Sequence, residues 1–207
     1  MTIKERIRYP FHVMLHPFDG FWCLKSEKKG GVKTAFVLMA LLFVTFIFRS
    51  YNTGYLAANN MAGEVSVFQL FLVIAVAYLL FCIANWSLTT LMNGEGRFSE
   101  ILTVTAYAML PIMIINIPLT LLSNVLTIGE LPFYTVFDTV GILWAAALLL
   151  IGCMTIHDYS MGKTIVVTLL TVVGMVIIAV LAVLFFNLIQ QVCIFFLSLV
   201  KEVQFRM

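Results

Sequence analysis

The chain has 207 residues, of which 62 % are hydrophobic and 11 % charged, and its formal net charge is +2. Soluble domains are typically about 45–50 % apolar and about 25 % charged, so the composition excludes an ordinary soluble domain. The small net charge, without a basic stripe interleaved with aromatic residues, argues against nucleic acid as a partner. We therefore predict an integral membrane protein whose solvent is the lipid bilayer.

The first 33 residues mix aromatic and basic side chains. Phe11, Phe18, Phe21 and Trp22 stand among seven lysines and arginines. Aromatic rings favour headgroup depth, and each cation near anionic lipid contributes about 1 kcal/mol. Residues 1–33 are therefore predicted to form a cytoplasmic, amphipathic interfacial segment. Docking of a partner protein is the alternative.

Five apolar stretches are long enough to cross the membrane, because a helix of about 20 residues spans the roughly 30 Å of hydrocarbon. They cover residues 34–50, 67–91, 101–127, 133–156 and 164–186. Backbone polar groups must be satisfied within each segment, which excludes an open sheet. The predicted fold is an all-α integral membrane protein, with a five-helix transmembrane bundle over residues 34–186 and interfacial helices at both termini.

The connections between these spans differ in charge. Nine Lys and Arg residues lie on the N-terminal side of the membrane and three on the opposite side. Basic connections are retained in the cytoplasm. We therefore predict a cytoplasmic N-terminus and an extracytoplasmic C-terminus.

Residues 187–207 are predicted to form an interfacial helix, because Lys201 and Glu202 come too soon for a sixth span. Apolar residues recur at spacings of four and three opposite Gln191 and Ser198, as in a helix that lies along a membrane surface. They are Leu188, Val192, Phe195, Leu199 and Val203. Extension of the fifth helix is the alternative.

A charged residue interrupts the fourth apolar stretch. Asp138 would cost at least about 2.5 kcal/mol at mid-bilayer without a partner. Arg49, at the end of the first span, has the same predicted depth, and Asn116 and Asn124 in the third span are alternative partners. These four residues form the candidate intramembrane polar site. A structural pair is favoured over a transport pathway, because a conduit normally needs a relay of several such groups.

The third span contains Pro111 and Pro118, seven residues apart. Each removes a backbone hydrogen bond, so a kink is predicted. Such a kink adapts helix packing, or it forms part of a binding site in a transporter.

The segment HDYSMGKT (residues 157–164) ends like a phosphate-binding loop. That loop requires a glycine five residues before Gly162, where this chain has His157. We predict no nucleotide site, and Lys163 is expected to act as a cytoplasmic-face charge at the entry to the fifth span.

Two other constellations resemble chemical sites. His12, His16 and Cys23 have spacings compatible with zinc, but prolines interrupt the helix and a fourth ligand is lacking. Cys153 and His157 are four residues apart, without an oxyanion donor nearby. We predict no metal, no cofactor and no catalytic residue.

Three segments, HPFDGFWCLK, AYAMLPIMI and HDYSMGKT, together with five spans and a cytoplasmic N-terminus, resemble the Yip membrane family, named for Ypt/Rab-GTPase-interacting proteins. The resemblance extends from about Pro17 to Asn187. The motif positions are Pro17, Tyr107, Pro111, His157, Ser160 and Lys163.

This resemblance implies a function. The eukaryotic branch of the family is associated with Rab GTPases through a long N-terminal region, which here has about 30 residues, so the chain is more similar to short bacterial members. Those members are often encoded near sugar-uptake transporters. We predict a non-enzymatic multi-pass protein of the bacterial cytoplasmic membrane that associates with other membrane proteins or itself, or organises the bilayer. The alternative is a small transporter or an accessory transporter subunit, possibly for sugar uptake.

Overall fold

The computed structural model describes residues 3–27, 31–58 and 66–206, and all regular elements in these ranges are helices. In chain order they are α1 (Ile3–Leu15), α2 (Pro17–Ser26), α3 (Val32–Asn52), α4 (Tyr55–Ala58), α5 (Val67–Leu91), α6 (Phe98–Ala108), α7 (Leu110–Leu122), the 3₁₀ turn η1 (Ile128–Glu130), α8 (Leu131–His157) and α9 (Met161–Arg206). Five spans are long and apolar enough to cross a membrane, with α6 and α7 together forming the third and η1 and α8 together the fourth. The predicted all-α membrane fold is confirmed.

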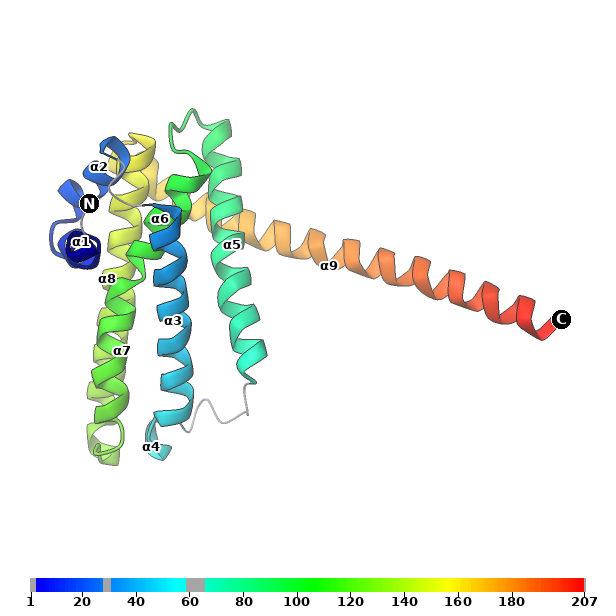
Figure 1. The fold of residues 1–207 in the computed structure, drawn as a ribbon, viewed down its shortest axis with the longest axis horizontal. Coiled ribbons are helices and arrows are strands. Elements are labelled where there is room, and N and C mark those ends of the chain that lie inside the picture. The colour runs from blue at the N-terminus through cyan, green and yellow to red at the C-terminus, as the bar shows by residue number, and fades with distance from the viewer. Residues whose placement is uncertain (1–2, 28–30, 59–65, 207) are drawn as a thin grey trace.

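The third span is the centre of the bundle. Its most apolar stretch is 61 % buried, far more than that of any other candidate span in the described ranges. α3 and α8 each pack against both of its halves, α6 and α7 (Figure 1). Where these helices meet α2, the core is made by Phe21, Ile101, Val104 and Ile156, which are almost completely buried.

The predicted kink lies at the first proline of this span. α6 ends at Ala108 and α7 begins at Leu110, because Pro111 has no N–H to donate to the carbonyl four residues earlier. Pro118 lies inside α7 without ending it. The span therefore has one break rather than two.

The α1–α2 hairpin packs across one end of the bundle. The Tyr9 hydroxyl donates to the Gly20 carbonyl at 2.7 Å, and the Tyr9 ring meets Tyr107 edge-on at 5.9 Å. Burial raises the pKa of Tyr9, which keeps its hydroxyl protonated as a donor. A Cβ on Gly20 would lie 2.7 Å from the Cα of Val13, so a glycine is needed where the two helices touch. The hairpin is thus fixed to the spans.

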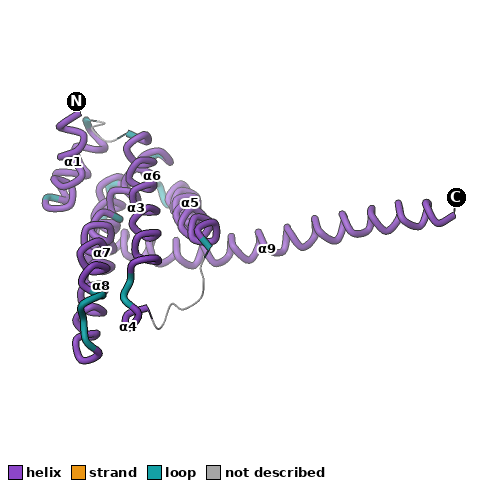
Figure 2. The backbone as a smooth tube through the Cα atoms, turned by 60° about the horizontal axis from the view of Figure 1, so that its bottom comes forward, coloured by secondary structure: helices purple, strands orange, loops and turns teal. Residues whose placement is uncertain are grey.

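α9 departs from the direction of the other spans. In Figures 1 and 2 it starts beside α5 and the end of α8, and then projects away from the bundle. Every described side chain from Ala179 to Leu199 is exposed, and we call this segment the arm.

The helix does not break at residue 187. α9 is continuous to Arg206, as in the alternative of an extended fifth helix, because no proline or glycine follows Gly174 and amide side chains are compatible with a helix. An interfacial location for residues 187–207 stays a prediction.

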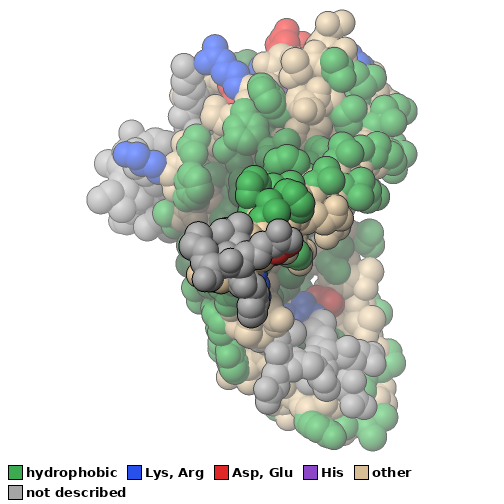
Figure 3. Space-filling model, turned by 90° about the vertical axis from the view of Figure 1, so that its right-hand side faces the viewer, with side chains coloured by type: hydrophobic (Ala, Val, Ile, Leu, Met, Phe, Trp, Pro, Cys, Tyr) green, Lys and Arg blue, Asp and Glu red, His purple; other side chains and the backbone are tan. Residues whose placement is uncertain are grey.

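The two ends of the bundle differ in charge. α1, α2, the turn at residues 92–97 and the turn at residues 158–160 lie together at one end, called the α2 end, whereas α4 and η1 lie at the opposite, α4 end. Figure 3 shows mainly hydrophobic side chains over the visible face, with charged ones at the α2 end and a few more lower in the molecule. This arrangement suits a lipid environment around the middle of the bundle.

Candidate functional site

Near the α4 end, Arg49 and Asp138 form a bidentate ion pair. Arg49 Nη1 donates to Asp138 Oδ1 at 2.8 Å, and Nη2 donates to Oδ2 at 3.1 Å. Arg49 is only 8 % exposed, and the Asp138 side chain is 22 % exposed. A fork-on-carboxylate geometry is the strongest form of this interaction, and it joins the last turn of α3 to α8.

Two further groups from other helices surround this guanidinium. Arg49 Nη1 also donates to Asn116 Oδ1 on α7 at 2.6 Å, and the Arg49 Cζ lies 5.8 Å from the centre of the Tyr134 ring. Arg49 Nε is buried without a hydrogen-bond partner. The pair is therefore well satisfied, with one unused donor and a carboxylate that is partly accessible.

Asn124 lies outside this group. Its amide donates to the Asn52 carbonyl at 2.8 Å and to the Thr120 carbonyl at 3.1 Å, so it joins the end of α7 to the end of α3. The structure thus brings together three of the four residues of the candidate polar site. Asn116 contacts Arg49 rather than Asp138, and Asn124 is not a partner of Asp138.

A second buried polar cluster lies near the α2 end, around His157. This imidazole is 2 % exposed. Its Nδ1 accepts from the Gly96 N–H at 3.3 Å, so Nε2 carries the proton and donates to Asn85 Oδ1 at 3.2 Å. The Asn85 amide in turn donates to Thr171 Oγ1 at 3.3 Å. A neutral histidine therefore connects α8 with α5, α9 and the turn after α5.

This turn lies against the segment that follows α8. A Cβ on Gly96 would lie 2.5 Å from His157 Cε1, and one on Gly94 would lie 2.7 Å from His157 Nδ1. Side chains at both positions would push the turn away from the ring. The glycines of the α5–α6 turn are therefore explained by its close approach to His157.

Two side chains near the start of α9 hold the same turn. The Tyr159 hydroxyl and the Lys163 ammonium donate to the Met92 carbonyl at 3.1 and 2.9 Å. Lys163 Nζ also lies 3.8 Å from the centre of the Tyr159 ring. Burial raises the pKa of Tyr159, which favours the protonated donor. Lys163 thus binds the backbone at the C-terminal end of α5.

The other family-motif residues lie at helix starts or in the packed core. Pro17 is the first residue of α2, Tyr107 is a buried core residue, and Pro111 is the second residue of α7. The Ser160 carbonyl accepts the Thr164 N–H in the first turn of α9, at 2.9 Å. These residues define helix starts and packing.

Sequence reasoning missed Asn85, Gly94, Gly96 and Tyr159. One signal was available, because Asn85 is a polar side chain inside an apolar span and needs a partner there. The two glycines indicated only a turn. Their contact with His157 depends on residues about 60 positions away.

The histidines considered for metal binding and catalysis make other contacts in the structure. No group of three His, Cys, Asp or Glu side chains that could hold a metal occurs among the described residues. The His12 and His16 rings stack at 5.2 Å on the hairpin. Both ring nitrogens of His157 are engaged by Gly96 and Asn85, so the imidazole is not available as a base for Cys153.

Comparisons with known proteins add one finding. The family model described as Yip1 domain matches residues 11–198. A search of curated proteins and a search of solved structures each found no match.

Proposed function

The chain belongs to the Yip1 domain family, and on that premise we propose that it is a non-enzymatic multi-pass membrane protein that acts by binding another membrane protein through the arm of α9. The partner is a different protein or a second copy of this chain. Organisation of the surrounding bilayer is the consequence of such lateral association.

One observation supports this proposal more than any other, namely a polar stripe on the exposed arm. Asn187, Gln191 and Ser198 are spaced by four and seven residues, which places them on one helical face. The amides of Asn187 and Gln191 make no hydrogen bond within the part of the chain that the structure describes. Amide side chains that lie beside apolar ones hydrogen-bond across helices and strengthen helix association.

The buried polar residues of the bundle differ from this stripe. Arg49 and Asp138 bind each other, and His157 binds Asn85, all within one chain. Their hydrogen bonds stabilise the bundle and leave little capacity for a partner. The arm offers both unmet hydrogen bonds and exposed apolar surface, which are the features of an association surface.

A photo-crosslinking experiment tests the proposal. A photoreactive amino acid at position 190, beside the stripe, should give a discrete protein adduct in intact membranes. The double variant Asn187→Leu, Gln191→Leu should lose the co-purifying partner, because its amides are gone while its apolar surface remains. The control Ile189→Leu, Val192→Leu alters the apolar face of the arm, opposite the stripe, and should retain the partner. Retention by the double amide variant, or crosslinking to lipid alone, would contradict the proposal.

A transport role is the second candidate, and the Asp138 carboxylate favours it because the side chain is partly exposed beside an unused Arg49 donor. Intramembrane acids of this kind occur in substrate and proton pathways. In proteoliposomes, sugar-dependent flux that disappears in Asp138→Asn would support it. An absence of flux with every sugar tested would leave association as the function.

We also propose a location, the bacterial cytoplasmic membrane, with a cytoplasmic N-terminus. The gathering of the basic N-terminal helices and the two turns at the α2 end supports this orientation, because basic connections are retained in the cytoplasm.

A further inference from the structure

An apolar groove of about 310 Å³ runs along the outside of the bundle between α3 and α7. Leu38 and Met113 form its floor and are buried, whereas Val37 and Ile117 form its rims and are about half exposed. The groove is therefore open sideways, toward the region that a bilayer would fill with acyl chains. Its volume lies at the lower end of the about 300–1,000 Å³ that is typical of small-molecule sites.

One end of this groove is closed by α1. Pro10 and Phe11 contribute to its lining, and Figure 1 looks almost along α1 while it shows α3 and α7 from the side, so the axis of α1 is steeply inclined to theirs. The buried residues Tyr9 and Val13 hold α1 in this position. The groove thus has a defined end at the level where a membrane surface is expected.

Two exposed cations belong to the helical turns that form that end. Arg8 is exposed and lies three residues before Phe11, and Lys33 is exposed and lies one turn before Val37. The first turn of α3 contains no acidic residue. Cations at the surface next to an apolar groove complement a lipid that has an anionic headgroup.

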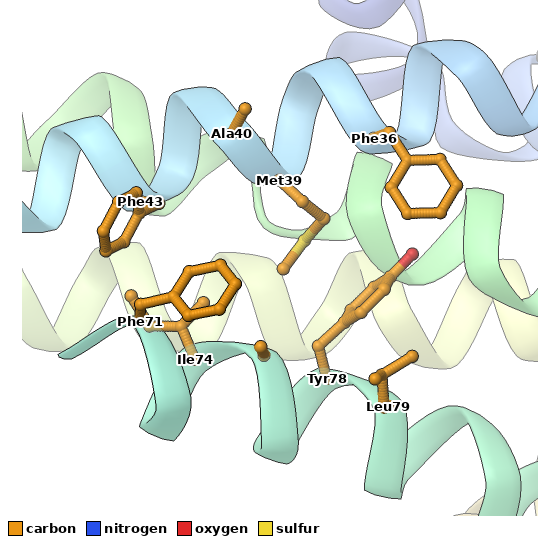
Figure 4. A pocket seen from close by; sticks show the side chains of 9 residues that line it. Phe36, Met39, Ala40, Phe43, Phe71, Ile74, Tyr78 and Leu79 are labelled. Atoms are coloured by element: carbon orange, nitrogen blue, oxygen red, sulfur yellow. The ribbon is translucent and has the colours of Figure 1, made fainter. Parts of the chain in front are cut away.

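A groove of similar size on the other side of α3 provides a contrast. It has a volume of about 360 Å³ and is lined by apolar side chains of α3 and α5 (Figure 4). Its one hydroxyl, on Tyr78, donates to the Leu102 carbonyl at 2.6 Å and is not free for a ligand. The described residues of α1 contribute nothing to its lining, so the N-terminal hairpin does not border it.

We propose that the α3–α7 groove binds one acyl chain of an anionic phospholipid, with the headgroup phosphate held by Arg8 and Lys33 at the α1 end. This binding site is independent of the association surface on α9. It would fix the α1–α2 hairpin at the membrane surface through a bound lipid.

The first test fills the groove. The full chain is purified in detergent and stripped of lipid, then titrated with phosphatidylglycerol, and bound lipid is counted by native mass spectrometry. Val37→Phe should reduce phosphatidylglycerol binding at least several-fold. Val44→Phe is the matched control, because Val44 is also on α3, is 58 % exposed compared with 59 % for Val37, and does not line the groove. Equal effects of the two substitutions would refute the groove as the site.

The second test removes the cations, in variants that leave the packed core untouched. Arg8→Gln and Lys33→Gln should each weaken phosphatidylglycerol binding about fivefold, with little change for zwitterionic phosphatidylcholine. Lys201→Gln, on the exposed C-terminal part of α9, should change neither. Equal binding of the two lipids to the unaltered protein, or an equal loss in the Lys201 variant, would overturn the proposal.

Discussion

The two ends of the bundle each bury a polar cluster, and the two clusters are built differently. At the α4 end, Arg49 and Asp138 are opposite charges that side chains alone bring together. At the α2 end, His157 is neutral, and it binds an amide on one side and the backbone of a glycine turn on the other. The first cluster is therefore stable only while its two charges balance. The second is stable only while the turn has no side chain that would overlap the His157 ring.

Because the two clusters are built differently, we expect different substitutions to destabilise them. Removal of one member of a buried ion pair leaves an unpaired charge in a low dielectric, whereas removal of both leaves none. In the neutral cluster a substitution leaves no unpaired charge, but a side chain at Gly94 or Gly96 would overlap the imidazole. Substitutions that change charge should therefore destabilise the cluster at the α4 end most. Substitutions that add volume should destabilise the cluster at the α2 end most.

The largest expected effect is the difference in thiol labelling between the two ends of the bundle. It is all-or-none, because each end lies on one side of the membrane. In a chain whose four native cysteines are replaced, Ser66→Cys should be labelled in intact cells by an impermeant thiol reagent. Glu95→Cys, in the turn of the α2 end, should be labelled only after lysis. The reverse pattern would invert the proposed orientation and would place the neutral cluster on the outer side.

The next largest effect concerns the ion pair. Arg49→Gln and Asp138→Asn should each lower the free energy of unfolding by about 3–5 kcal/mol, because the remaining charge is buried without its partner. The double variant should recover part of this loss. Thermal unfolding in detergent measures all three variants, and strictly additive losses would show that the pair is not coupled.

A smaller effect is expected when volume is added at the α2 end. Gly96→Ala should cost about 1–3 kcal/mol, because its Cβ would overlap the His157 ring. Gly162→Ala is the control, since no atom lies within 4 Å of a Cβ at that position. If both variants unfold at the temperature of the unaltered protein, the turn does not pack against His157 as described.

The smallest effect should come from one hydroxyl. Tyr159→Phe removes the donor to the Met92 carbonyl and keeps the ring beneath Lys163, so a loss of about 0.5–1.5 kcal/mol is expected. Tyr55→Phe, at a residue that is 85 % exposed, should change the stability much less. A loss in the Tyr159 variant as large as that in Gly96→Ala would mean that the hydroxyl, rather than space, holds the turn.

The apolar spans could be predicted closely, and their ends less well. The second span was predicted over residues 67–91, and α5 covers Val67–Leu91. The third span was predicted to reach residue 127, but α7 ends at Leu122. The Ser123 side chain accepts the Gly54 N–H at 2.9 Å, so a contact with the end of α3 occupies the segment where a helix was expected. Such a contact is invisible in the local apolar pattern.

The amino-acid sequence by itself determined that five helices are apolar enough for lipid and that Asp138 needs a partner, because both follow from the cost of placing a group in hydrocarbon. Tertiary structure decided that the partner is Arg49, supported by Asn116, and that Asn124 binds elsewhere. It also decided that His157 meets Gly96, and that α9 leaves the bundle. Burial in lipid depends on the composition of one segment, whereas the choice of a hydrogen-bond partner depends on the depth and rotation of helices from distant segments.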